Sequence, residues 1–200
     1  MHYRKENEQM TSIFETVTAE QFKGYYARDF SFLPVFIYGN TYWKDDIVYW
    51  TDDNFYKSLT DDNETTPDDT ENWQKVKGNV YDYVTDDDIM KAFTQALANS
   101  STRFGKDCNE KIMIFLHLMA FYLVVDMQNA AVGLGSSYSG LVASKSVDGV
   151  SESYNFPTWL TESPMYSLFS QNGYGLKYLS LILPYLACPI LFSRGDSTCG

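Results

Sequence analysis

The stretch GLVASKSVDGVSESYNFP at residues 140–157 decides the fold that the sequence predicts. Small and hydroxyl-bearing residues recur around apolar ones on both sides of Asp148-Gly149, and an Asp-Gly pair in this setting is the strongest short-range signal for a β-hairpin. A lone hairpin is marginally stable in water, and this one has too few large apolar residues to bury a face against its own chain. We therefore expect a long hairpin that projects from a helical body and packs on a partner, most naturally a second copy of the chain. The predicted contact residues are Leu141, Val142, Ser144, Lys145, Ser146, Val147, Val150, Ser151, Ser153 and Tyr154.

The composition is that of a globular protein with a surplus of aromatic rings. The chain has 200 residues, 44% hydrophobic and 16% aromatic, which predicts one domain or one domain with a sizeable insertion. The surplus rings either fill an aromatic core or serve contacts between proteins. A net charge of −11 argues against direct binding of nucleic acid, whose affinity depends on neutralising phosphates.

Cysteine and histidine usage argues against a disulfide framework and against a zinc site. The three cysteines are Cys108, Cys188 and Cys199, with no CxxC pair, and the only histidines are His2 and His117. Unpaired thiols in a reducing compartment are the expectation.

Neither of the two long apolar runs is expected to cross a membrane. The run at 112–125 is shorter than the ~20 residues that a spanning helix needs. The run at 178–192 is interrupted by Pro184 and Pro189. We expect both runs to be buried in protein, and the polar residues 1–12 show no signal peptide.

Two segments predict the main helices of the body. Residues 85–100 (TDDDIMKAFTQALANS) place apolar side chains at every fourth position, and the acidic residues at 86–88 cap the helix start rather than bind a metal. Residues 109–131 form the central helix, and residues 112–125 within it are apolar nearly all round, so this helix should be the most buried. His117 lies inside it without a partner at a catalytic spacing, which indicates a core histidine.

Short helices are expected near both ends of the chain. At the C-terminal end, one begins at Pro164, a favoured first position, and is broken by Gly173-Tyr174-Gly175. A second covers residues 176–183 and is stopped by Pro184. Near the N-terminus, a short helix at 21–29 precedes an extended apolar run at 30–38.

Residues 41–80 differ in composition from everything that follows and predict a small β module. Short strands rich in β-branched and aromatic residues are expected at 47–50, 54–59 and 73–76, and residues 60–72 form an acidic loop. The pattern DDIVYW, FYKSL, Pro and NW resembles the small chitin-binding-type carbohydrate modules. That resemblance implies that Tyr42, Trp50 and Trp73 stack on sugar rings. The alternative is that these rings form the core of the module itself.

The order of segments after the module resembles the head completion, or head-to-tail adaptor, proteins of tailed bacteriophages. The residues that carry the resemblance are the helix DDDIMKAFTQA, the central helix FLHLMAFYLVVD, the block GLVASKSVDGVSESY followed by FP, and MYSLFSQNGYGLKYLSL. The GLVASKSV block is the most specific, and YARDFSFLPVF near the N-terminus extends the match. The β module lies outside the typical core of that family.

The adaptor resemblance implies a ring, usually dodecameric, between the portal protein and the tail. Such a ring extends the DNA channel, through which the genome passes without specific binding, and offers the tail or nozzle protein a docking surface. The residues agree, because the hairpin and the broken apolar segments are surfaces that need neighbours. The resemblance places the chain in the virion at the head-to-tail interface, after assembly in the host cytoplasm.

Taken together, these patterns predict an α+β fold, mainly an α-helical bundle with a long protruding β-hairpin, plus a small all-β insertion near the N-terminus. The expected divisions are an arm at 1–40, the β module at 41–80, the adaptor body at 81–185 and a tail at 186–200. We expect no catalysis, no cofactor and no metal, because no catalytic constellation is evident. The alternative function is a carbohydrate-binding virion or secreted module that uses the aromatic residues of 41–77.

Overall fold

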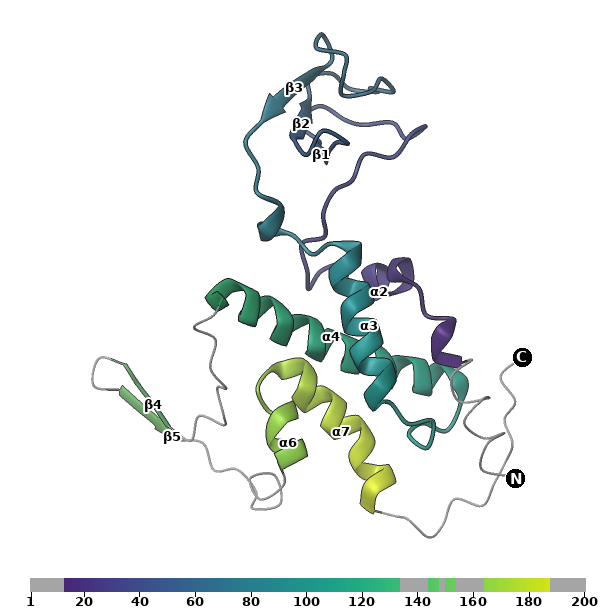
Figure 1. The fold of residues 1–200 in the computed structure, drawn as a ribbon, viewed down its shortest axis with the longest axis vertical. Helices are drawn as coiled ribbons and strands as arrows, with labels where there is room; N and C mark the ends of the chain where they lie inside the picture. Colours follow the sequence, from purple (N-terminus) through teal and green to yellow (C-terminus); the bar gives the residue numbers. More distant parts are fainter. Residues whose placement is uncertain (1–12, 134–143, 148–149, 154–163, 188–200) are drawn as a thin grey trace. The chain divides into compact units, whose positions relative to one another are not determined.

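The computed structural model describes residues 13–133, 144–147, 150–153 and 164–187 of the chain. The fold is mixed α+β (Figure 1). The chain divides into two compact units. The helical unit combines Met1–Phe22 with Asp87–Gly200, and the sheet unit is Lys23–Asp86. Each unit is described by itself.

The helical unit is built around one long helix. Its elements are α3 (Asp86–Asn99), α4 (Cys108–Val132), α6 (Pro164–Phe169) and α7 (Gly173–Ala187), and α2 (Ala19–Tyr25) begins in it. In Figure 1, α7 runs beside α4, and α6 leads into α7. The predicted central helix and the predicted helix at 85–100 are both confirmed, to within one residue at each end.

The middle of α4 forms the core of the helical unit, as its all-round apolar sequence predicted. All residues from Ile114 to Phe121 are buried, as is Leu123. Burying one large apolar side chain contributes about 1.5–3 kcal/mol, so this stretch carries much of the stability of the unit. The side chain of Asp107 caps the helix by accepting a hydrogen bond from the backbone N–H of Glu110 at 2.9 Å.

The helix α7 is longer than predicted. The stop expected at Pro184 was wrong, because the proline lies inside α7, near its end. Pro184 gives no hydrogen bond to the preceding turn and its ring crowds the carbonyl of Ser180, yet the helix continues to Ala187 and the proline is exposed. At the other end, the side chain of Asn172 accepts a hydrogen bond from Gly175 N–H at 3.0 Å, so the glycines begin the helix instead of separating two helices.

The sheet unit contains a three-stranded antiparallel sheet in the order β1-β2-β3. The strands are β1 (Ile47–Tyr49), β2 (Phe55–Ser58) and β3 (Trp73–Val76), followed by the 3₁₀ turn η1 (Val80–Asp82). All three strands that the sequence predicted are present. The strands are short, so the backbone alone stabilises the sheet little, and side chains must hold it together.

The sheet unit covers a longer stretch of the chain, residues 23–86, than the module predicted at residues 41–80. The apolar run expected at 30–38 is extended, and its Val35 forms a parallel bridge with Tyr49. Where the chain enters and leaves the unit, Leu33 N–H donates to Val84 O at 2.9 Å, and Lys23 and Asp86 form an ion pair at 2.7 Å. The two ends of the unit are therefore paired, as in a domain inserted into a host chain.

A separate two-stranded sheet lies within the predicted hairpin. Strand β4 (Ser144–Val147) pairs with β5 (Val150–Ser153) in antiparallel register. The innermost pair is Val147 with Val150, which places Asp148-Gly149 at the turn in the sequence. The strand pairing is confirmed, and the remaining parts of residues 140–157 lie outside the described residues.

Candidate functional site

The hairpin is the first candidate interface, and its register sorts the predicted contact residues into two faces. Successive strand positions alternate between the faces of a sheet. The pairs Ser144 with Ser153 and Ser146 with Ser151 therefore share one face, and the pairs Lys145 with Glu152 and Val147 with Val150 share the other. One face thus has four serine positions, and the other has a pair of opposite charges and a pair of valines. The predicted contact residues Leu141, Val142 and Tyr154 lie outside the described part of the chain.

The second candidate is the set of aromatic residues predicted to bind sugar, Tyr42, Trp50 and Trp73. These residues belong to the core of the sheet unit. Trp50 is 7% exposed and Trp73 is 2% exposed, and both pack in one cluster with Phe36 and Val48. Tyr42 is partly buried against this cluster, with its ring stacked on Phe36 at 5.1 Å. This burial argues against exposed stacking platforms for sugars and for the alternative, in which the rings form the module's own core.

Polar bonds fix the rings of this core in place. The indole N–H of Trp73 donates to the backbone oxygen of Thr65 at 3.0 Å. The Tyr42 hydroxyl accepts from Ile37 N–H at 2.7 Å and donates to the oxygen of the same residue at 3.2 Å. Each ring thus also positions a loop, so a substitution there would loosen both the core and the connections between strands.

The other face of the sheet carries apolar side chains that the sequence reading missed. Val35 and Ile37 are 55% and 58% exposed, and Ile47 is 44% exposed. At the other end of this face, Phe55 is covered by Tyr83, with ring centroids 5.5 Å apart. The signal was present in the sequence, because apolar residues occupy both alternating sets of positions in these strands, which is unusual for a sheet with one buried face.

The turns of the sheet unit are held by aspartates. Asp45, Asp53 and Asp62 all have positive φ, at 72°, 62° and 51°, a conformation that Asp tolerates better than most residues. A hydrogen-bonded ion pair with Lys57 at 2.9 Å holds the pKa of Asp45 below its usual value. The hydrogen bond that the Tyr49 hydroxyl donates to Asp53 at 2.7 Å raises the pKa of that phenol.

The sheet unit also carries more than its share of the negative charge. Residues 23–86 contain 13 Asp and Glu against 6 Lys and Arg, a net charge of −7 out of −11 for the chain. The acidic side chains lie in the turns and in the loop before β3, where they are mostly exposed. A surface of this kind repels nucleic acid and other anions.

The described residues contain no cluster that could hold a metal ion. Among them, no three or more His, Cys, Asp or Glu side chains come together in a way that could hold a metal ion. His117 is buried in the middle of α4, at 7% exposure. Cys108, at the start of α4, is disulfide-bonded, so the expectation of three unpaired thiols was wrong. The spacing of three cysteines gives no indication of which pairs form, because pairing depends on distances in the fold.

The helix α4 has the length and composition of a membrane span, the one such helix in the described ranges. The same properties belong to the core helix of a soluble protein. Half of its most apolar window is buried inside the protein. The buried stretch from Ile114 to Phe121 fits the core role, in agreement with the expectation from the sequence.

Comparison with known proteins gives no relative from which a function could be transferred. No family model, curated protein or solved structure matches the chain.

Proposed function

We propose that the chain is a structural virion protein of a tailed bacteriophage, a head-to-tail adaptor. In this proposal its copies form a ring, with twelve subunits as the resemblance implies, between the portal protein and the tail. The ring extends the DNA channel and offers the tail its docking surface. The protein carries out no reaction and needs no cofactor.

The observation that carries the proposal is the β4–β5 hairpin and its position in the chain. It follows the long core helix α4 and precedes the helix pair α6 and α7, which is the order that the adaptor resemblance implies. The hairpin forms a sheet of its own and does not join β1-β2-β3. A two-stranded sheet is marginal in water, so in the proposed ring it is stabilised by the neighbouring subunit.

The finer architecture of the proposal is a helical bundle from which the hairpin protrudes, with the sheet unit as an insertion. The buried core of α4 supports the bundle, and the paired ends of residues 23–86 support the insertion. The acidic character supports a conduit, because like charges discourage passing DNA from sticking to the wall.

The test replaces residues 144–153 with a Gly/Ser linker of the same length in the full chain. We expect a folded monomer that no longer forms rings, as measured by mass photometry and circular dichroism. The matched control exchanges Lys145 and Glu152, which keeps the opposite charges at one cross-strand pair. The exchanged variant should still assemble, and rings that persist with the linker would show that the hairpin does not join the subunits.

A second measurement separates the adaptor from other virion roles. Quantitative mass spectrometry of the particle that contains this chain compares its copy number with that of the portal protein. We expect equal numbers in a ring that sits on the portal. Absence from the particle, or a number that matches the shell or the fibres, would contradict the adaptor function.

A further inference from the structure

Exposed apolar side chains are concentrated in the sheet unit. Among the described residues, twelve large hydrophobic side chains are exposed, and eight of them belong to this unit, although it is the smaller of the two. Three of the eight, Ile37, Tyr38 and Trp43, lie within one short segment of the chain. Single exposed apolar residues are normal, but a group of them typically marks a surface that contacts another molecule.

Trp43 is the most exposed tryptophan of this unit. The other two tryptophans in the described ranges, Trp50 and Trp73, are buried in the core, whereas Trp43 is 59% exposed. In the same segment, Tyr38 is 71% exposed even though its ring packs edge-on against Trp50 at 5.7 Å. Tryptophan and tyrosine are enriched among the few side chains that carry most of the binding energy of an interface. Residues 37–43 are therefore a candidate surface for a partner.

Hydrogen bonds fix the backbone of this segment at both ends. At its start, the Tyr42 hydroxyl bonds to the N–H and to the oxygen of Ile37, at 2.7 and 3.2 Å. At its end, Trp43 N–H donates to Asp46 Oδ2 at 2.7 Å, and Asp46 N–H donates to Trp43 O at 3.0 Å. The backbone below the exposed rings is therefore ordered before any partner arrives. Binding at such a preorganised surface costs little further conformational entropy.

Carboxylates lie on the same side of the unit as the Trp43 ring. Tyr42 and Asn63 exchange two backbone hydrogen bonds of 2.9 Å, and both side chains point into the unit, where Asn63 is buried and Tyr42 packs on the core. Successive residues of an extended chain alternate between its two sides. Their neighbours Trp43, Asp62 and Glu64 accordingly lie on the outer side, and all three are exposed.

The charge around Trp43 selects the partner. Residues 41–64 contain seven Asp and Glu against two Lys, and one of the two, Lys57, is already paired with Asp45. This negative charge repels nucleic acid, anionic membranes and a second copy of the same surface. It attracts a protein surface that carries arginine. A guanidinium group stacks on an indole ring and also binds a carboxylate through two parallel hydrogen bonds.

We propose that residues 37–43 form a docking surface for an arginine-bearing surface of another protein, with Trp43 as its anchor. A guanidinium group of the partner stacks on the indole ring and bonds to a neighbouring carboxylate, Asp62 or Glu64. The other exposed apolar side chains of the segment contact apolar groups of the partner around this anchor. The surface belongs to the sheet unit, so it depends neither on the hairpin nor on the proposed ring.

Titration of the full chain with two peptides of equal length and charge tests the anchor. One is an arginine–glycine repeat and the other a lysine–glycine repeat, and the NMR signal of the Trp43 indole N–H reports binding at the site. We expect this signal to shift with the arginine peptide, which should bind about two- to fivefold more tightly than the lysine peptide. Trp43→Ala should remove this preference and leave the fold unchanged, because the side chain is exposed.

The matched control is Tyr81→Ala, which removes a 91% exposed ring of the same unit outside the segment and should leave both affinities unchanged. Asp62→Asn keeps a residue that tolerates the positive φ of 51° at this position, and it should weaken binding of the arginine peptide and its dependence on salt. Equal affinities of Trp43→Ala and the unchanged chain for the arginine peptide would overturn the proposal, because they would show diffuse attraction between charges. A Trp43 signal that shifts only with chito-oligosaccharide, or only with protein concentration, would overturn it in favour of a sugar or of a second copy.

Discussion

The cores of the two units are built from different kinds of elements. In the helical unit one helix, α4, supplies nine buried residues in a single element. In the sheet unit the strands have three or four residues each, so the core depends on a cluster of large aromatic rings. The comparison shows that a small sheet concentrates its stability in a few side chains, whereas a long helix distributes it.

The units also differ in how they satisfy buried polar groups. In the helical unit, side chains satisfy backbone N–H groups at the helix starts, as Asp107 does for Glu110 and Asn172 does for Gly175. In the sheet unit the buried Asn63 side chain donates to Ser58 Oγ at 3.0 Å and to Asn72 O at 3.2 Å, and it accepts from Thr65 N–H at 3.0 Å. One amide thus connects three loop or strand positions that no regular ladder joins.

The largest effect that this comparison predicts is the loss of the sheet unit on truncation of one ring. Trp73→Ala removes a side chain that is 2% exposed and packs on Phe36 and Tyr42. We expect a loss of about 3–5 kcal/mol, comparable with the whole stability of a unit of this size. Hydrogen exchange by NMR should show strands β1 to β3 unprotected, while α4 and α7 keep their protection.

The control for this change is Trp43→Ala, because Trp43 is a tryptophan of the same unit that is 59% exposed. Its truncation should change stability by less than about 0.5 kcal/mol. Binding of soluble chito-oligosaccharide, measured on both variants, also tests the alternative function. A Trp73→Ala variant that folds normally and loses sugar binding would contradict the core role and restore the carbohydrate site.

The parts of the fold that the sequence predicted are those where local pattern and tertiary packing agree. The all-round apolar stretch of α4 and the β-branched and aromatic runs of β1 and β2 each favour one structure, and that structure is the one observed. The stop predicted at Pro184 was wrong because a proline weakens a helix without always ending it, and α7 continues for three more residues to Ala187.

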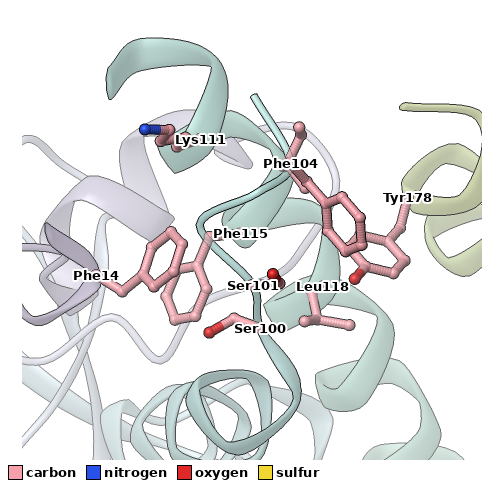
Figure 2. Close-up of a pocket in the computed structure, with 9 residues that line it drawn as sticks. Phe14, Ser100, Ser101, Phe104, Lys111, Phe115, Leu118 and Tyr178 are labelled. Atoms are coloured by element: carbon pink, nitrogen blue, oxygen red, sulfur yellow. The ribbon is translucent and has the colours of Figure 1, made fainter. Parts of the chain in front are cut away.

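The candidate site was harder to predict because it depends on distances between segments. The register of the hairpin follows from Asp148-Gly149, but the burial of Trp50 and Trp73 follows from how residues 34–38 fold back on β1. The small pocket of the helical unit (Figure 2) is lined by side chains from residues 14, 100–104, 111–118 and 178, which no local pattern connects. Composition and residue spacing do not indicate which distant segments of the chain lie next to each other in the fold.

The second prediction tests the close packing of the helical unit at a single glycine of α7. A methyl group at Gly175 would lie 2.7 Å from the Phe121 ring of α4 and even closer to the carbonyl oxygen of Phe169. Backbone atoms cannot move aside cheaply, so Gly175→Ala should cost about 1–3 kcal/mol. The loss should appear in thermal unfolding of α4, α6 and α7, with the sheet unit unchanged.

A neighbouring glycine provides the matched control for this substitution. A Cβ at Gly173, in the first turn of α7, would meet no atom within 4 Å. Gly173→Ala should therefore be neutral or slightly stabilising, because alanine favours a helix over glycine. Equal effects of the two variants on stability would show that the close contacts at Gly175 do not control the stability of this region.

The smallest predicted effect is a difference in how the two units respond to pH. In the sheet unit, hydrogen bonds from Lys57 and from Asn72 hold the pKa values of Asp45 and Asp69 below their usual 3.8. A carboxyl group whose pKa is lower in the folded state contributes stability above the unfolded value, and that stability is lost as the pH falls through the folded pKa. The three carboxyl groups whose pKa values are lowered, Asp45, Asp52 and Asp69, all belong to the sheet unit.

The alkaline response should involve both units. In the helical unit, burial and a hydrogen bond to Glu110 raise the pKa of Tyr185 to about 12. In the sheet unit, the hydrogen bond to Asp53 raises the pKa of Tyr49. A phenol whose pKa is higher in the folded state contributes stability below the unfolded value of 10, and that stability is lost as the pH rises toward 12.

Acid is therefore the condition that separates the two units. Hydrogen exchange at pH 3, compared with pH 6, should show weaker protection in β1 to β3 and little change in α4 and α7. The aspartates concerned are exposed, so salt should reduce the Asp45 contribution, which depends on a surface ion pair, more than that of Asp69, which depends on hydrogen bonds from Asn72 and Glu71 N–H. Lys57→Met removes the ion pair and should abolish the salt-sensitive part of the acid response. An acid loss that is equal in both units would show that the turn aspartates do not govern the stability of the sheet unit.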